Sequence, residues 1–81
     1  MKKQTIEQFL LQQYSSQTVK TYLFNINHFL KLNPKAKRYK YQNILDYMEE
    51  ISKKQSNPKY RVVILSAIKK YYDYLVINGY R

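Results

Sequence analysis

The sequence contains no cysteine and no tryptophan, only one glycine and two prolines, and few acidic residues. Without cysteine the chain can form neither a disulfide framework nor a thiolate metal site. The scarcity of glycine and proline leaves little material for tight turns, so we expect a few long elements, which favours helices over a small sheet. The 81 residues are enough for one small domain, which we expect to span residues 1–81.

Long apolar segments are missing as well. No stretch approaches the roughly 18 apolar residues that a membrane span needs. Met1, Lys2 and Lys3 are followed by polar residues rather than by the apolar segment of a signal peptide. We therefore expect no membrane partner and a cytoplasmic location, which also fits the lack of cysteine.

Positive charge dominates what is present. Fifteen Lys and Arg face five Asp and Glu, which gives a formal net charge of +10 and an isoelectric point near 9.8. Such a charge attracts polyanions, and this balance is typical of nucleic-acid binders. A basic domain that is merely soluble is the alternative. The 44% of hydrophobic residues argues against a disordered chain.

Apolar residues recur at spacings of three and four in four segments, which predicts four helices over about residues 5–13, 16–32, 41–53 and 58–77. Thr5, Ser15 and Asn57 are suited to cap helix starts, since their side chains can accept hydrogen bonds from free backbone N–H groups. Asn33-Pro34 and Asn78-Gly79 are suited to end helices. The expected fold is a compact, all-α four-helix bundle.

The last helix should be the most buried of the four. Its expected inner stripe comprises Tyr60, Ile64, Ala67, Ile68, Tyr71 and Leu75. The helix over residues 41–53 carries Asp46, Glu49 and Glu50 on its outer side, so we expect it to face away from a polyanion. Residues 33–40 have no apolar period and form a basic loop.

Catalytic groups are hard to find. His28 is the only histidine and has no cysteine to join it as a metal ligand. The acidic residues form no convincing acid–base pair, and a single glycine excludes a phosphate-binding loop. Most of the ten tyrosines lie at core spacing, where the ring packs and the hydroxyl reaches the surface. We expect no catalytic residue, no metal and no cofactor.

The outer faces of two helices suit DNA. In the helix over 16–32, Lys20, Phe24, Asn27 and Lys31 lie opposite the inner stripe, with Gln17 and Thr21 on one shoulder. In the helix over 58–77, the outer arc holds Lys59, Val62, Ser66, Lys69, Lys70 and Asp73. Lysines neutralise phosphates, while amides and hydroxyls reach base edges. A solvated charged face explains the same pattern. The apolar Phe24 indicates a contact with the first helix or with a partner.

Two stretches resemble the core-binding, SAM-like N-terminal domain of tyrosine recombinases and phage integrases. The first is Ser15-Ser16-Gln17-Thr18-Val19-Lys20-Thr21-Tyr22, continuing to Ile26 and Phe29. The second is Leu65-Ser66-Ala67-Ile68-Lys69-Lys70-Tyr71-Tyr72-Asp73-Tyr74-Leu75, closing on Asn78-Gly79. The order and separation of the two stretches make the resemblance more specific than either stretch alone, and it covers almost the whole chain.

The resemblance implies a helical domain that clamps one face of the duplex, with the helices over 16–32 and 58–77 crossed at the major groove. Val62 and Val63 replace the polar residues often found at these positions, which weakens the expectation that the second helix reads bases. The expected DNA-binding residues are Gln17, Thr18, Lys20, Thr21, Lys59, Arg61, Val62, Ser66, Lys69 and Lys70, with further phosphate contacts from Lys35, Lys37, Arg38 and Lys40.

The implied function is that of a sequence-specific DNA-binding domain of a site-specific tyrosine recombinase, encoded by a bacterium, a phage or a mobile element. It would hold a recombination half-site for a C-terminal catalytic domain that the 81 residues do not include, so the domain alone is not an enzyme. Double-stranded DNA, that catalytic domain and other protomers of a synaptic complex are the implied partners. The alternatives are a helical protein–protein interaction module with a basic solvated surface and an independent helix-turn-helix regulator, which would need a much shorter turn than residues 33–40 provide.

Overall fold

The computed structural model describes residues 4–54 and 57–80. Within them the chain forms helices α1 (Ile6–Leu11), α2 (Ser16–Leu32), α3 (Tyr41–Lys54) and α4 (Pro58–Ile77), with a short 3-10 helix η1 (Ala36–Arg38), and no strand. The predicted all-α fold with four helices is therefore confirmed. The residues used to argue against a signal peptide, 1–3, and part of the connection expected between the helices over 41–53 and 58–77 fall outside the described residues.

The helix ends are fixed by the side chains that the sequence provides for them. The Thr5 hydroxyl accepts a hydrogen bond from the backbone N–H of Gln8, whose side chain accepts one from the backbone N–H of Thr5. Ser15 and Asn57 cap α2 and α4 with their side-chain oxygens. Gly79, with a φ of 76°, follows the end of α4 in the left-handed conformation that glycine adopts without steric cost.

Three local details differ from the expectation. The helix α1 ends at Leu11 rather than at residue 13, because the backbone tightens into a turn in which the N–H of Gln13 bonds the carbonyl of Leu10 at 3.0 Å. The helix α3 extends one residue further, to Lys54. The basic loop contains η1, whose Ala36 is buried and accepts a hydrogen bond of 2.7 Å at its carbonyl from the hydroxyl of Tyr72.

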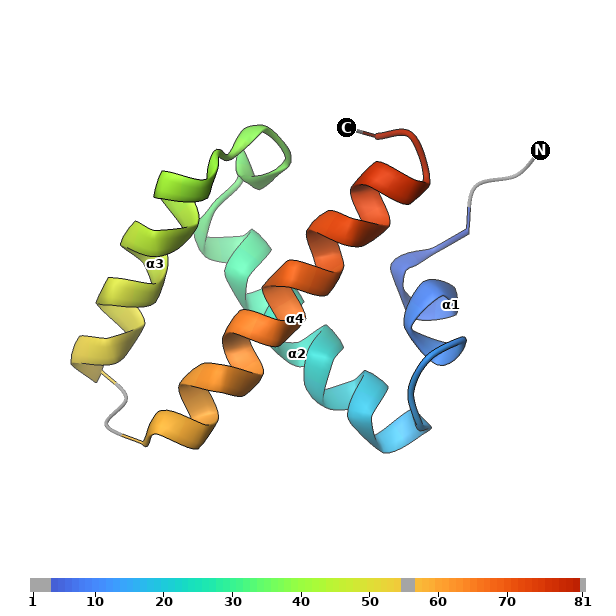
Figure 1. The fold of residues 1–81 in the computed structure, drawn as a ribbon, viewed down its shortest axis with the longest axis horizontal. Helices are drawn as coiled ribbons and strands as arrows, with labels where there is room; N and C mark the ends of the chain where they lie inside the picture. The colour runs from blue at the N-terminus through green and yellow to red at the C-terminus, as the bar shows by residue number, and fades with distance from the viewer. Residues whose placement is uncertain (1–3, 55–56, 81) are drawn as a thin grey trace.

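The helices α2 and α4 cross each other and make the largest helix–helix contact, while α1 and α3 flank the crossing on opposite sides (Figure 1). Both crossed helices begin at the lower edge of the molecule in the view of Figure 1, and both run towards the upper edge, where η1 also lies. The lower edge therefore contains the N-termini of α2 and α4, and the upper edge contains their C-termini together with η1. We call the lower edge the start edge and the upper edge the end edge.

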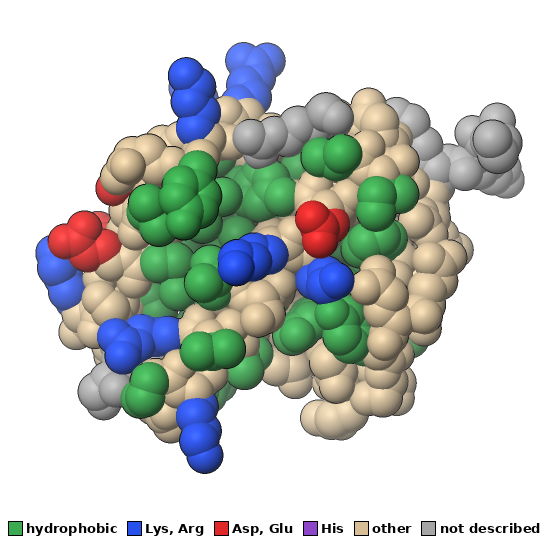
Figure 2. Space-filling model, in the orientation of Figure 1, with side chains coloured by type: hydrophobic (Ala, Val, Ile, Leu, Met, Phe, Trp, Pro, Cys, Tyr) green, Lys and Arg blue, Asp and Glu red, His purple; other side chains and the backbone are tan. Residues whose placement is uncertain are grey.

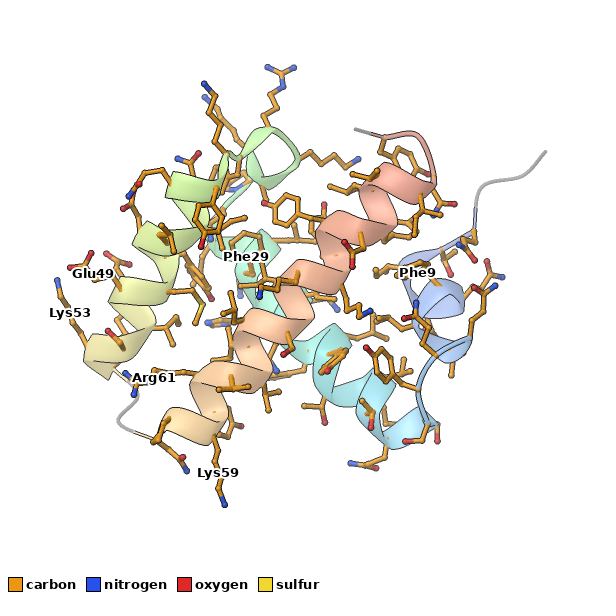
Figure 3. All side chains as sticks on the ribbon, viewed as in Figure 1. Phe9, Phe29, Glu49, Lys53, Lys59 and Arg61 are labelled. Atoms are coloured by element: carbon orange, nitrogen blue, oxygen red, sulfur yellow. The ribbon has the colours of Figure 1, made fainter. Side chains whose placement is uncertain are left out.

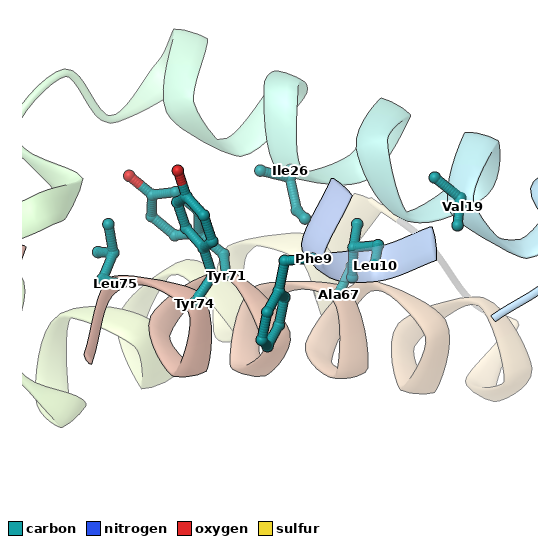
Figure 4. Packing of buried hydrophobic residues seen from close by; sticks show 8 residues of the cluster. All are labelled: Phe9, Leu10, Val19, Ile26, Ala67, Tyr71, Tyr74 and Leu75. Carbon is teal, nitrogen blue, oxygen red and sulfur yellow. The ribbon is translucent and has the colours of Figure 1, made fainter. Parts of the chain in front are cut away.

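The core consists of two clusters of buried side chains. The first joins α1, α2 and α4 and contains Phe9, Leu10, Val19, Ile26, Ala67, Tyr71, Tyr74 and Leu75 (Figure 4). The second joins α2, η1, α3 and α4 and contains Phe29, Ala36, Tyr47, Ile64 and Ile68. In the second cluster the rings of Phe29 and Tyr47 meet edge to face at 4.9 Å. The helix α4, the longest of the four, contributes more buried residues than any other helix.

The prediction that Tyr60 belongs to the buried stripe of α4 is wrong. Tyr60 is 52% exposed, whereas the other five stripe residues are buried. Residues 58–60 are all exposed, because the first turn of α4 lies at the start edge, beyond the crossing with α2 (Figure 1). The spacing of apolar residues correctly places Tyr60 on the same side of α4 as the buried stripe, but no helix packs over its ring at this edge.

Candidate nucleic-acid interface

The start of α2 places a mixed polar and basic surface at the start edge. Gln17, Lys20 and Thr21 are exposed, and Thr18 is half-buried. The Ser15 side chain accepts a hydrogen bond from the backbone N–H of Thr18 and fixes the first turn. The Thr21 hydroxyl donates to the carbonyl of Gln17 at 3.3 Å, so its oxygen keeps accepting capacity towards solvent. This part of the predicted set forms one contiguous helical surface.

The start of α4 adds a second basic position at the same edge. Lys59 is exposed and extends away from the molecule at this edge, while Arg61 points towards the end of α3 (Figure 3). Val62 is 63% exposed, although it is apolar. The structure therefore places Lys59 at the start edge, at the opposite corner of that edge from the first turns of α2, and directs Arg61 to a different place (Figure 3).

Further along α4, the predicted residues are less accessible. Lys69 is exposed, but Ser66 and Lys70 are half-buried. The Lys70 ammonium donates to the side-chain oxygen of Gln13 at 3.1 Å and lies 5.8 Å from the centre of the Tyr14 ring. Helical periodicity placed Lys70 on an outer arc, but its long side chain folds back onto the connection between α1 and α2. No local pattern identifies Gln13 as its partner.

The four cations of the basic loop lie elsewhere. Lys35, Lys37, Arg38 and Lys40 are exposed and belong to the segment at the end edge, opposite the starts of α2 and α4 (Figure 1). The predicted DNA-binding residues thus divide into a set at the start edge, a set along α4 and a set at the end edge. They do not form a single patch.

Charges of both signs are unevenly distributed over the molecule. The first turns of α2 and α4 contain no acidic residue, so the positive ends of both helix dipoles stay uncompensated. Asp46, Glu49 and Glu50 are exposed on α3 and line an outer groove with Lys53, and Figure 3 shows Glu49 and Lys53 on the side of α3 away from α4. On the face shown in Figure 2, blue and red side chains are interspersed over α4, so this face is not uniformly basic.

Comparison with known families identifies the domain type. The sequence model described as the phage integrase N-terminal SAM-like domain matches residues 6–79, which is nearly the whole chain. The chain belongs to this family. The resemblance carried by residues 15–22 and 65–75 is confirmed, and the family's domains bind DNA in tyrosine recombinases and are not catalytic. No curated protein and no solved structure matches the chain significantly.

The integrase domain carries one exposed aromatic pair on α2. The Phe24 ring is 69% exposed and stacks on His28, with the ring centres 6.5 Å apart and the planes 7° from parallel. Both residues border a groove that also contains Ile51 of α3 and Tyr60 of α4. Phe24 therefore lies on the side of α3 and not against α1, which corrects one of the two contacts expected for it.

Three buried tyrosines of the integrase domain are poor nucleophiles. Burial raises the pKa of Tyr47, Tyr71 and Tyr74, which disfavours the phenolate that would attack phosphorus. Residues 4–54 and 57–80 contain no group of three or more His, Cys, Asp or Glu that could hold a metal ion. No helix in the same part of the chain is long and apolar enough to cross a membrane.

Proposed function

We propose that this integrase domain binds one half-site of a recombination target in duplex DNA through the start edge. The observation that carries the proposal is that α2 and α4 begin at the same edge (Figure 1), and that Gln17, Lys20, Thr21 and Lys59, near the starts of these helices, are exposed. Neither first turn contains an acidic side chain that would repel phosphate.

Each residue of this surface has a distinct task in the proposal. Lys20 and Lys59 neutralise phosphates, and the two helix N-termini add positive potential. Gln17 and Thr21 carry the amide and hydroxyl groups that reach base edges in a major groove. The exposed Val62 offers an apolar contact of the kind that thymine methyl groups accept. Thr18 lies within the first turns of α2, whereas Arg61, Ser66, Lys69 and Lys70 lie outside this surface, so all five contribute less.

The domain presents the bound half-site to a catalytic domain of the same polypeptide, and synapsis brings it together with other recombinase protomers. Membership of a family of non-catalytic N-terminal integrase domains supports this division of labour. Residues 1–81 form one DNA-binding domain in this proposal, and the protein acts in the cytoplasm. An independent helix-turn-helix regulator fits less well, because residues 33–40 and their 3-10 helix separate α2 from α3.

A titration of a fluorescent duplex of about 20 base pairs at several salt concentrations tests the proposal. Four to six phosphate contacts predict a log–log salt slope of about −4 to −5, and a non-specific Kd of about 10⁻⁴ to 10⁻⁶ M at physiological salt. Binding that is insensitive to salt, or no binding at low salt, would contradict the proposal. That result would favour the alternative of a helical protein–protein interaction module.

A further inference from the structure

An open pocket lies at the end edge, away from the surface proposed for the half-site. It has a volume of about 600 Å³ and is formed by the end of α2, the loop around η1 and α4. Three cationic residues of the loop, Lys35, Lys37 and Arg38, line the pocket together with Leu30 and Tyr71. No acidic residue of residues 4–54 or 57–80 lines this pocket.

Tyr71 supplies a hydroxyl donor that no described residue uses. Its side chain is only 5% exposed, and no residue in the described ranges forms a hydrogen bond with it. No fully inaccessible side-chain polar atom in this part of the chain lacks a partner, so the Tyr71 oxygen has some access to solvent, and Tyr71 is one of the residues that line the pocket. The neighbouring Tyr74 differs, because its hydroxyl donates to the carbonyl of Gln4 at 2.8 Å. In Figure 4 the hydroxyls of both rings point towards the side of α2.

The cationic wall of the pocket is held in place by contacts with α4 and with the segment that follows it. The Tyr72 hydroxyl donates to the carbonyl of Ala36 at 2.7 Å, and Ala36 is buried between Lys35 and Lys37. The ammonium of Lys37 lies 5.2 Å from the centre of the Tyr80 ring. The loop therefore presents its cations from a fixed backbone rather than from a free segment.

This combination of groups matches the chemistry of an oxyanion. The lining residues Lys35, Lys37 and Arg38 bring positive charge to the pocket, and phosphate offers several oxygens that accept hydrogen bonds at once. Burial raises the pKa of Tyr71, so the phenol stays protonated and acts as a donor at neutral pH. The Tyr71 hydroxyl has no partner in the described ranges, so it remains available to donate a hydrogen bond to an oxyanion in the pocket.

We propose that the pocket formed by Lys35, Lys37, Arg38 and the Tyr71 hydroxyl is a phosphate-binding site separate from the start edge. The phosphate is either a backbone phosphate of a DNA segment other than the half-site or free inorganic phosphate. The site goes beyond the proposed half-site binding and does not depend on it, because the two surfaces lie at opposite edges of the domain (Figure 1).

Titration of the ¹⁵N-labelled domain with inorganic phosphate, against chloride at equal ionic strength, tests the site. We expect phosphate-specific shifts at residues 35–38 and at Tyr71. Tyr71→Phe should weaken phosphate binding about tenfold, as expected when a hydrogen bond to a charged group is lost. The matched control Tyr60→Phe alters a half-exposed ring at the other edge and should change nothing. Arg38→Gln, at an exposed position, should also weaken binding, whereas Lys53→Gln on α3 should not.

Duplex titrations of the same variants distinguish the two sources of phosphate. If DNA supplies it, Tyr71→Phe and Arg38→Gln also lower the affinity for duplex; if free phosphate is the ligand, they bind duplex like the wild type. The site is refuted if Tyr71→Phe and Arg38→Gln bind phosphate like their controls, or if the shifts occur only at the starts of α2 and α4. Lys20→Gln probes the half-site surface alone, so a failure of that proposal is recognised separately.

Discussion

Lys20 and Lys53 carry the same charge in different surroundings. Lys20 is exposed near the start of α2, where no acidic residue precedes it in the first turn. Lys53 is exposed near the end of α3 and shares a groove with Asp46, Glu49 and Glu50. We predict that Lys20→Ala lowers duplex affinity clearly and reduces the salt slope by about one, as the loss of one phosphate contact requires. Lys53→Ala should change little, because the long-range effect of its charge is screened over about 8 to 10 Å.

Both variants are compared on the same duplex in the same buffer by fluorescence anisotropy. Their circular dichroism should match that of the wild type, since both side chains lie outside the two core clusters. Equal losses at the two positions would show that bulk charge alone drives binding, and would contradict the start edge as the docking surface.

Two side chains show which features of the structure helical periodicity does not predict. The period gave the outward direction of Lys70 and the inward direction of Tyr60, yet Lys70 contacts Gln13 and Tyr60 is half-exposed. Direction around a helix axis follows from local sequence. The length of a flexible side chain and the place where a neighbouring helix ends do not, because they depend on residues far apart in the chain.

At the scale of elements, the connection between α2 and α3 depends on a contact with α4. We predict that Tyr72→Phe, which removes the hydroxyl bonded to the carbonyl of Ala36, lowers the free energy of unfolding by about 1 kcal/mol. The backbone amides of residues 35–38 should then exchange with solvent faster than in the wild type. Urea unfolding and hydrogen exchange measure the two effects.

The control for this prediction is Tyr60→Phe, which makes the same chemical change on a half-exposed ring of α4. It should leave both the unfolding midpoint and the exchange of residues 35–38 unaltered. A Tyr72→Phe variant with wild-type exchange in the loop would show that the hydroxyl does not anchor η1.

The long helices were predictable in full, whereas η1 was not. The bounds of α2 and α4 agree with the sequence, because each begins at a side chain able to cap it and ends at a segment unable to continue it. In the basic loop, only Ala36 is buried, and its partner Tyr72 is 36 positions away. A single alanine among cationic residues gives no repeating apolar spacing, so the sequence predicts a loop at residues 33–40 but not the 3-10 helix within it.

At the scale of the whole molecule, the sequence predicted how much charge the domain carries but not where the charge lies. The cations of residues 35–40 and those at the starts of α2 and α4 are brought to opposite edges by the crossing of the two long helices (Figure 1). A helical wheel describes each helix separately and has no information on that crossing. The candidate site was therefore predicted as one set of residues, and the structure divides it.

The net charge of +10 predicts opposite effects of salt on folding and on DNA binding. The longest extent of the domain is 42 Å, and like charges repel across most of it at 0.01 M salt, where the Debye length is about 30 Å. At 0.15 M the Debye length falls to about 8 Å, so the repulsion that opposes folding is largely removed. We predict that the melting temperature rises by several degrees over this range, since about 1 kcal/mol corresponds to roughly 4–8 °C for a domain of this size. Duplex affinity should fall over the same range, because counterion release is weakened.

Thermal unfolding followed by circular dichroism in sodium chloride measures the effect on folding. Replacing chloride by phosphate at equal ionic strength separates general screening from binding at the Tyr71 pocket. A melting temperature that is constant or falls with added chloride would mean that the cations are already compensated within the fold.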